Sequence, residues 1–213
     1  MIPKLHYISQ GSSPKEHLEN IQKACNAGAE LVQLRLKKVS DKEGLRIAQE
    51  AREITSHFQT RLIINDHYKI ARVIKADGVH LGKTDTSPTI ARRHIYTWQI
   101  IGGTANTLHD CEAFIARDVD YISLGPFRTT TTKAQLPPVL GLKGYAAIID
   151  ALNTETPIIG VGGITTNDVT AILETGISGI AVSGAITHDF NTIKAFHQLL
   201  NASSTEEQRH TFK

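Results

Sequence analysis

The sequence predicts an α/β protein, a single-domain (β/α)8 TIM barrel. Short runs rich in Ile, Val and Leu alternate with longer amphipathic stretches, the pattern of βα units that build a parallel sheet. Eight such units can be counted, and their unbroken alternation favours one domain over two. A chain of 213 residues is at the lower end of the size of such barrels, so most connections between elements must be short.

The expected strands are short and rich in β-branched residues. In order, they cover residues 4–9, 31–36, 61–66, 78–82, 99–104, 121–127, 157–164 and 179–185. The clearest helical patterns cover residues 14–27, 41–57, 144–152 and 166–176, with Ser13, Ser40 and Thr165 as N-cap residues. Gly28 and Gly176 come at two helix ends, where the left-handed conformation that glycine tolerates ends a helix.

The domain boundaries follow from this pattern. We assign residues 1–201 to the barrel and residues 202–213, which are charged and polar, to a C-terminal tail that frays or caps the amino-terminal side of the barrel. An open, doubly wound sheet is the alternative architecture. It is disfavoured because no glycine-rich turn follows the first expected strand.

Composition and charge exclude several classes of protein. Hydrophobic residues make up 40% and charged residues 21%, as in ordinary globular proteins, and the net charge of +2 is too small for a nucleic-acid-binding surface. No stretch approaches the roughly 20 apolar residues that span a bilayer, and residues 1–5 do not resemble a signal peptide. We therefore expect a cytoplasmic protein whose partners are small-molecule substrates, without nucleic acid or membrane. Association into a homo-oligomer stays open.

Two carboxylates, Asp66 and Asp85, follow adjacent strands at the end of the barrel where such folds carry their active sites. Magnesium binds one or two carboxylates, keeps several waters and completes its octahedron with phosphate oxygens. The structural alternative makes Asp66 an N-cap and Asp85 a turn residue before residues 86–88. The residues alone leave the two interpretations equally open.

Three cations, Arg35, Lys37 and Lys133, lie at or after the ends of expected strands, at the same end of the barrel. Such convergent charge would bind a pyrophosphate, although single basic residues after a strand are more often solvated surface. Lys133 lies in residues 128–138, a polar connection far longer than its neighbours, and long βα loops often carry ligand contacts.

Glycine-rich ends of the last two strands suggest a phosphate site. Gly162 and Gly163 lie at the end of the seventh expected strand, and Ser183 with the glycine after it lies at the end of the eighth. Barrels often bind phosphate there, since glycine lets backbone amides approach an anion; the alternative is that these glycines only permit tight packing. His80 is expected to be a hydrogen-bonded core histidine, and His188 either approaches the phosphate or lies in solvent.

The motifs, taken in order, resemble thiamine phosphate synthase from about residue 5 to residue 188. Four of them are Val32-Gln33-Leu34-Arg35-Leu36-Lys37, Ile63-Ile64-Asn65-Asp66, Gly78-Val79-His80-Leu81-Gly82-Lys83-Thr84-Asp85 and Asp120-Tyr121-Ile122-Ser123-Leu124-Gly125-Pro126-Phe127. The other two are the loop of residues 128–138, which contains the threonines and Lys133, and the pair Gly162-Gly163. The resemblance implies a transferase that joins 4-amino-5-hydroxymethyl-2-methylpyrimidine pyrophosphate to 4-methyl-5-(2-phosphoethyl)thiazole. Any one of these motifs is weak, whereas six in register are specific.

The resemblance also implies a role for individual residues. Asp66 and Asp85 hold Mg²⁺, and Gln33 contacts the aminopyrimidine. Arg35, Lys37 and Lys133 are the catalytic cations. The pyrophosphate meets Arg35, Lys37, Asn65, Thr104 and Lys133, with Thr130 and Thr132 as the loop threonines, and the thiazole phosphate meets Gly162, Gly163, Val182 and Ser183.

Two positions depart from the family pattern. The usual Ser-x-His after the fifth strand is Thr104-Ala105-Asn106 here, and a common Gln is replaced by Lys83. A thiazole tautomerase of the same fold relies on a histidine at the position of Asn106, so this alternative enzyme is disfavoured. The alternative from another class is a non-catalytic barrel that senses phosphorylated metabolites.

Overall fold

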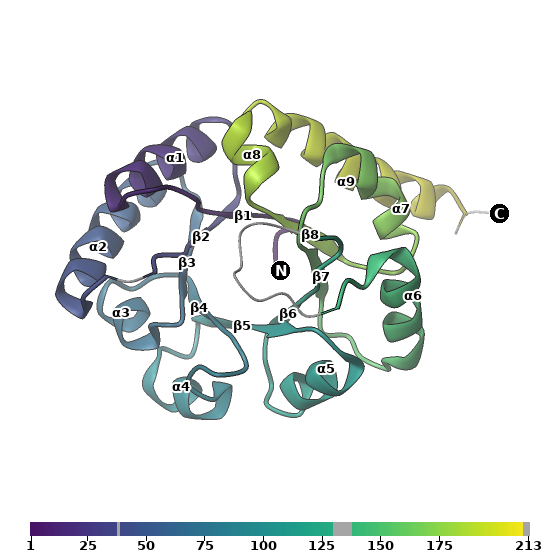
Figure 1. Cartoon of the computed structure of the whole chain (residues 1–213), viewed down its shortest axis with the longest axis horizontal. Helices are drawn as coiled ribbons and strands as arrows, with labels where there is room; N and C mark the ends of the chain where they lie inside the picture. The colour runs from purple at the N-terminus through teal and green to yellow at the C-terminus, as the bar shows by residue number, and fades with distance from the viewer. Residues whose placement is uncertain (38, 130–137, 211–213) are drawn as a thin grey trace.

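Eight parallel strands close into a barrel in chain order, from β1 to β8, with helices around the outside (Figure 1). The structure, a computed structural model, describes residues 1–37, 39–129 and 138–210, and the side chains of those residues up to residue 202. The strand order and the parallel pairing of β1 with β8 confirm the prediction of a single (β/α)8 barrel.

The strands lie where the apolar runs predict them. They are β1 (Leu5–Ile8), β2 (Leu31–Leu34), β3 (Arg61–Asn65), β4 (Gly78–Leu81), β5 (Ile100–Ala105), β6 (Tyr121–Leu124), β7 (Ile158–Val161) and β8 (Gly179–Val182). Only β5 passes the expected boundary, by one residue at Ala105. Several expected strands are longer than the observed ones because residues after the last paired position turn into the loops of the carboxyl end.

The helices alternate with the strands. They are α1 (Pro14–Asn26), α2 (Asp41–His57), α3 (Tyr68–Val73), α4 (Pro88–His94), α5 (Leu108–Ile115), α6 (Gly141–Ala151), the 3-10 turn η1 (Thr166–Asp168), α7 (Val169–Leu173), α8 (Gly184–His188) and α9 (Thr192–His210). The hydroxyls of Ser13 and Ser40 accept the backbone N–H groups of Glu16 and Glu43, as expected of N-caps.

The helix ends also follow the sequence. Thr165 and Asp168 form a reciprocal capping box at the start of η1. Gly28 and Gly176 have φ of +95° and +86°, the left-handed conformation expected at these helix ends. Helix α9 continues beyond residue 201 to His210 and so includes most of the segment that we expected as a tail. This segment contains no Gly or Pro that would end a helix.

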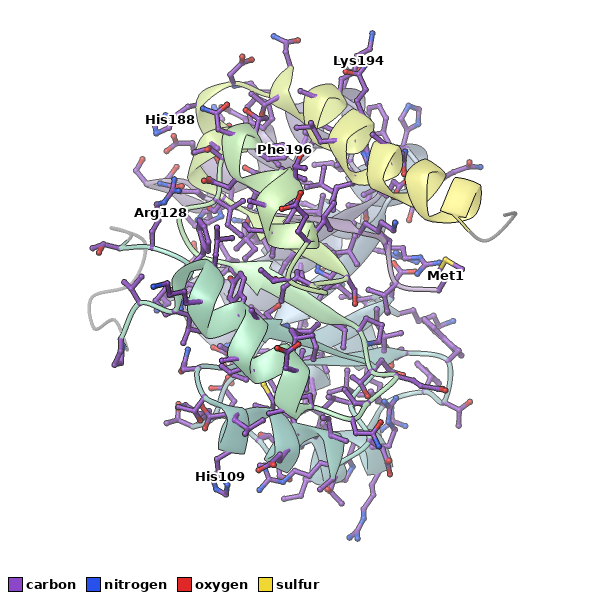
Figure 2. The ribbon with its side chains drawn as sticks, turned by 90° about the vertical axis from the view of Figure 1, so that its right-hand side faces the viewer. Met1, His109, Arg128, His188, Lys194 and Phe196 are labelled. Carbon is purple, nitrogen blue, oxygen red and sulfur yellow. The ribbon has the colours of Figure 1, made fainter. Side chains whose placement is uncertain are left out.

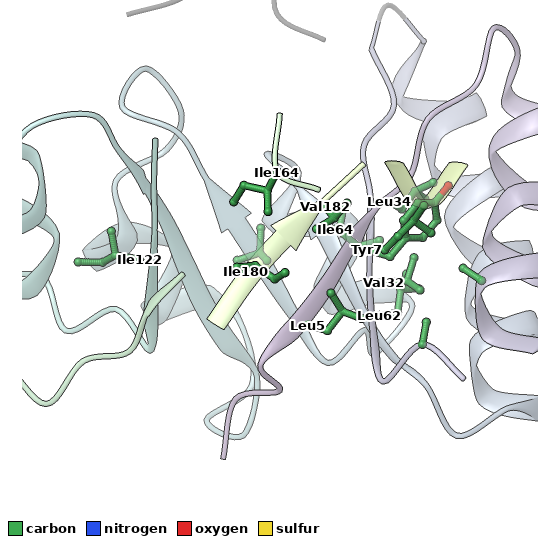
Figure 3. Packing of buried hydrophobic residues seen from close by; sticks show 14 of the residues in the cluster. Leu5, Tyr7, Val32, Leu34, Leu62, Ile64, Ile122, Ile164, Ile180 and Val182 are labelled. Carbon is green, nitrogen blue, oxygen red and sulfur yellow. The ribbon is translucent and has the colours of Figure 1, made fainter. Parts of the chain in front are cut away.

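Alternation along the strands sends one set of side chains toward the helices and the other into the barrel. Leu5, Val32, Leu62 and Ile180 belong to the outer set and are buried in the layer between strands and helices (Figure 3). The inner set includes a separate small cluster of Tyr121, Ile159 and Ala181. Apolar side chains therefore pack against one another inside the barrel as well as outside it, and polar side chains also lie in the barrel interior.

Cys25 and Cys111 are buried free thiols. In the described part of the chain, no helix has both the length and the apolar character needed to cross a membrane.

Candidate active site

A cavity of about 880 Å³ opens at the carboxyl ends of the strands. It is lined by every expected binding residue that the structure describes, namely Gln33, Arg35, Lys37, Asn65, Asp66, Asp85, Thr104, Gly162, Gly163, Val182 and Ser183. Thr130, Thr132 and Lys133 lie outside the described residues. Arg128 and His188 lie at this same end of the molecule, and Met1 lies at the opposite end (Figure 2). The fold thus brings together side chains that are far apart in sequence.

Asp66 and Asp85 meet inside the cavity. Their carboxyl groups lie against each other, and burial together with Asp85 raises the pKa of Asp66 from 3.8 to about 7. Arg35 and Lys37 act in the opposite direction and favour the ionised form of Asp66. Two carboxylates this close repel each other when both are ionised, so a shared proton or a cation between them stabilises the arrangement.

Local backbone geometry creates this contact. Asp66 directly follows β3 with φ of +65°, and its N–H donates to the His80 carbonyl at 2.9 Å. Asp85 accepts the Gly82 N–H at 2.5 Å. The N-cap position of α3 is His67, so Asp66 is not the N-cap that the structural alternative required. The Asp85 carboxylate bonds back to Gly82 and closes the turn that precedes it, which is a different turn from the one before residues 86–88 that the structural alternative proposed.

The sequence did not predict the hydrogen bonds that hold the backbone of Arg35. The Ser9 hydroxyl accepts the backbone N–H of Arg35 at 3.1 Å and lies 2.8 Å from His17 Nδ1. Both Ser9 and His17 are buried. Ser9 directly follows β1 and His17 belongs to α1, so these two elements fix the position of the Arg35 backbone. The only signal of this contact in the sequence was the polar residue at the end of the first expected strand.

The loops after β6 and β7 are held together where Gly162 and Gly163 line the cavity. Arg128 donates its backbone N–H to the Gly162 carbonyl at 3.0 Å and its guanidinium to Asp168 at 2.5 Å. Gly162 and Gly163 have φ of +108° and +69°. A Cβ on Gly163 would lie 2.4 Å from Arg128 Cγ. Glycine is therefore required here by both backbone conformation and close packing.

Ser183 at the end of β8 has a partner that the sequence did not suggest. Its hydroxyl donates to Gln10 Oε1 at 3.3 Å, and Gln10 also lines the cavity. His188 lines the cavity as well.

The two departures from the family pattern are accommodated by one carboxylate. Lys83 forms an ion pair with Asp110 at 3.0 Å, and Asp110 also accepts the backbone N–H of Asn106 at 2.9 Å. Although burial opposes it, these hydrogen bonds hold the pKa of Asp110 below its ordinary value. The Asn106 side chain donates to the Gly125 carbonyl at 2.6 Å. Asn106 is thus a structural link between β5 and β6, and its amide offers no base for proton transfer.

The donor set fits a hard divalent cation. No cluster of three or more His, Cys, Asp or Glu side chains arranged for a metal occurs among the described residues. Magnesium needs fewer protein ligands than such a cluster provides, since water and substrate phosphate complete its coordination. The Asp66–Asp85 pair beside Arg35 and Lys37 matches that requirement.

The chain is similar to known proteins of one family. A family model described as thiamine monophosphate synthase matches residues 5–186. Thiamine-phosphate synthase of Flavobacterium johnsoniae is 42% identical over 190 residues, which cover 88% of this chain and 90% of that protein. The enzyme of the same name from Flavobacterium psychrophilum is 42% identical over 202 residues, covering 93% and 98%. The solved structure of thiamine phosphate pyrophosphorylase from Pyrococcus furiosus has a TM-score of 0.80 at 26% identity and covers 93% of this chain and 96% of that one. The chain described here belongs to the thiamine monophosphate synthase family.

Proposed function

We propose that this chain is a magnesium-dependent thiamine phosphate synthase. It condenses 4-amino-5-hydroxymethyl-2-methylpyrimidine pyrophosphate with 4-methyl-5-(2-phosphoethyl)thiazole and releases pyrophosphate. The observation that carries the proposal is the contact between Asp66 and Asp85 in a cavity that Arg35 and Lys37 also line. Family membership supports the same reaction.

Asp66 and Asp85 would hold Mg²⁺, and Arg35, Lys37, Asn65 and Thr104 would surround the pyrophosphate. When bound, the metal neutralises negative charge on the leaving group. Arg35 can bind two phosphate oxygens at once, and Lys37 contributes a compact positive charge. Lys133, with Thr130 and Thr132, would complete the pyrophosphate site from the loop after β6. This arrangement stabilises the charge that grows on pyrophosphate as it leaves.

The reaction needs no protein nucleophile. The bond between the pyrimidine methylene carbon and the pyrophosphate oxygen breaks, and its electron pair leaves with pyrophosphate. The electron-rich aminopyrimidine ring stabilises the resulting cation, and the thiazole nitrogen then donates its lone pair to the same carbon. Gly162, Gly163, Val182 and Ser183 would hold the thiazole phosphate so that this nitrogen faces the carbon. The protein supplies positioning and exclusion of water.

The proposal is tested by incubating the purified protein with both substrates and Mg²⁺ and measuring thiamine phosphate and pyrophosphate. We expect equal amounts of the two products and none after addition of a metal chelator. A parallel reaction with thiazole carboxylate phosphate and no pyrimidine measures isomerisation. Isomerisation without condensation would identify a tautomerase, and tight substrate binding without either product would identify a non-catalytic sensor.

A further inference from the structure

A chain of four polar side chains crosses the barrel interior beneath the cavity. The Tyr121 hydroxyl lies 2.9 Å from His80 Nδ1, and His80 Nε2 lies 2.7 Å from Thr104 Oγ1. At the other end, the Gln33 side chain hydrogen-bonds to the Tyr121 hydroxyl. Gln33 and Thr104 line the cavity. The two residues at the ends of the chain, which would face substrate, are thus linked through Tyr121 and His80.

The residues around Tyr121 leave just enough space for its ring inside the barrel. Tyr121 is fully buried at 0% exposure, and a Cβ on Gly102 of the neighbouring strand would lie 2.1 Å from its Cζ atom. The ring of His6 packs edge-on against Tyr121 with a centroid distance of 5.0 Å. Because a buried polar group without a partner is costly, the four side chains must keep their hydrogen bonds to one another.

Such a chain has a direction, because a hydroxyl or a neutral imidazole donates one hydrogen and accepts another. In one direction the Gln33 amide N–H donates to Tyr121, Tyr121 to His80 Nδ1, and His80 Nε2–H to Thr104. The cavity then meets the Gln33 carbonyl oxygen, an acceptor, and the Thr104 hydroxyl hydrogen, a donor. The opposite direction would present the Gln33 amide hydrogens and a lone pair of Thr104.

The chemistry of the proposed substrate favours the first direction. Its ring amino group needs an acceptor, which the Gln33 carbonyl oxygen supplies when the Gln33 amide N–H donates to Tyr121. The Tyr121 hydrogen is then available to His80 Nδ1, which lies at hydrogen-bonding distance.

We propose that Tyr121 and His80 are positioning residues that hold Gln33 as an acceptor and Thr104 as a donor toward the pyrimidine pyrophosphate. This inference rests on the proposed function, because that substrate carries an amino donor on its ring and acceptor oxygens on its pyrophosphate. One chain of hydrogen bonds would thus present an acceptor to the amino group and a donor to the pyrophosphate of the same substrate. A 4-oxo pyrimidine analogue would place a carbonyl against the Gln33 carbonyl and be rejected.

The direction can be measured without any substrate. Nitrogen-15 NMR distinguishes the two neutral tautomers of an imidazole, and the His80 signal is identified by its absence in the His80→Gln variant. We expect hydrogen on Nε2 and none on Nδ1. Hydrogen on Nδ1 in the wild-type protein would overturn the inference, because His80 would then donate to Tyr121.

Selectivity is tested with Tyr121→Phe, which removes only the hydroxyl. We expect the ratio of kcat/KM for the amino substrate over its 4-oxo analogue to fall roughly tenfold or more, with the KM for thiazole phosphate unchanged. Tyr145→Phe is the matched control. It also removes a buried tyrosine hydroxyl, but one that donates to the Leu124 backbone carbonyl at 2.9 Å in the layer outside the barrel.

The outcomes separate this inference from the proposed function. An unchanged ratio in Tyr121→Phe, or an equal fall in Tyr145→Phe, would refute positioning by Tyr121 even if the wild-type enzyme makes thiamine phosphate. If the wild-type protein makes no product, the proposed function fails. The imidazole tautomer, with calorimetry of the amino and 4-oxo pyrimidine pyrophosphates, then decides the inference on its own.

Discussion

Replacing Asp66 with asparagine should stabilise the metal-free protein while removing a ligand of the proposed magnesium site. Asp66 has its pKa raised from 3.8 to about 7 by burial and by Asp85. The folded chain therefore binds a proton at Asp66 more tightly than the unfolded chain does. The corresponding stability is fully present below pH 3.8 and is lost as the pH rises to about 7. Asp66→Asn lacks this titration, so it should escape the loss.

The size of the effect follows from the pKa. A difference of roughly 3 corresponds to about 4 kcal/mol, since one pKa unit is worth about 1.4 kcal/mol. Asp66 is only half-buried, and solvent screens part of its repulsion with Asp85, so we expect about 2 kcal/mol. In a chain of this length, 1 kcal/mol changes Tm by about 2–4 °C. Asp66→Asn should therefore melt about 4–8 °C above the wild type at pH 8, with little difference near pH 4.

The assay is thermal unfolding followed by circular dichroism in the presence of a chelator, from pH 4 to pH 8. Asp110→Asn is the matched control, because the pKa of Asp110 is lowered and its removal should destabilise the protein at pH 8. Added Mg²⁺ should raise the Tm of the wild type and leave that of Asp66→Asn unchanged. A Tm of Asp66→Asn at or below the wild type at pH 8, or a gap that does not change with pH, would refute the reasoning.

Three other substitutions test separate parts of the site. Arg128→Gln removes the ion pair with Asp168 that holds the Gly163 turn, so the KM for thiazole phosphate should rise several-fold while that for pyrimidine pyrophosphate changes little. Gly102→Ala would bring a methyl group within 2.1 Å of Tyr121 Cζ, and this overpacking should lower stability by about 3 kcal/mol or more in urea unfolding. Lys133→Ala should lower kcat far more than it raises the KM for thiazole phosphate.

Each of these has a clear contrary result. Equal increases in both KM values for Arg128→Gln would mean that the ion pair supports the whole cavity and not the phosphate side. Wild-type stability of Gly102→Ala would show that Tyr121 can move away from β5. Full turnover by Lys133→Ala would remove that residue from the reaction.

The fold and the convergence of the site could be predicted because both follow from local pattern and topology. Apolar runs locate strands, and parallel strands in a closed barrel bring all their carboxyl ends to one face. The sequence therefore predicted that Asp66 and Asp85 lie near each other. The capping residues Ser13 and Ser40 were found for a similar reason, since capping depends on a few neighbouring residues.

The side-chain partnerships could not be predicted, because they depend on barrel register and long-range contact. His80 was expected to be a satisfied core histidine, and both ring nitrogens do lie at hydrogen-bonding distance from side-chain oxygens. Its partner Tyr121 is 41 residues away, and no sequence spacing identifies such a pair. The ion pair of Arg128 with Asp168, 40 residues apart, was missed for the same reason. Polar residues at inward strand positions were the one available signal.

The central claim is that Asp66 and Asp85 share a divalent cation beside the pyrophosphate. It is tested most directly by growing crystals with Mn²⁺ and pyrophosphate and measuring anomalous diffraction at the manganese edge. We expect one strong peak within coordination distance of both carboxylates and of pyrophosphate oxygens, and its loss in Asp66→Asn. A peak that contacts neither carboxylate, or pyrophosphate bound away from Arg35 and Lys37, would contradict the account.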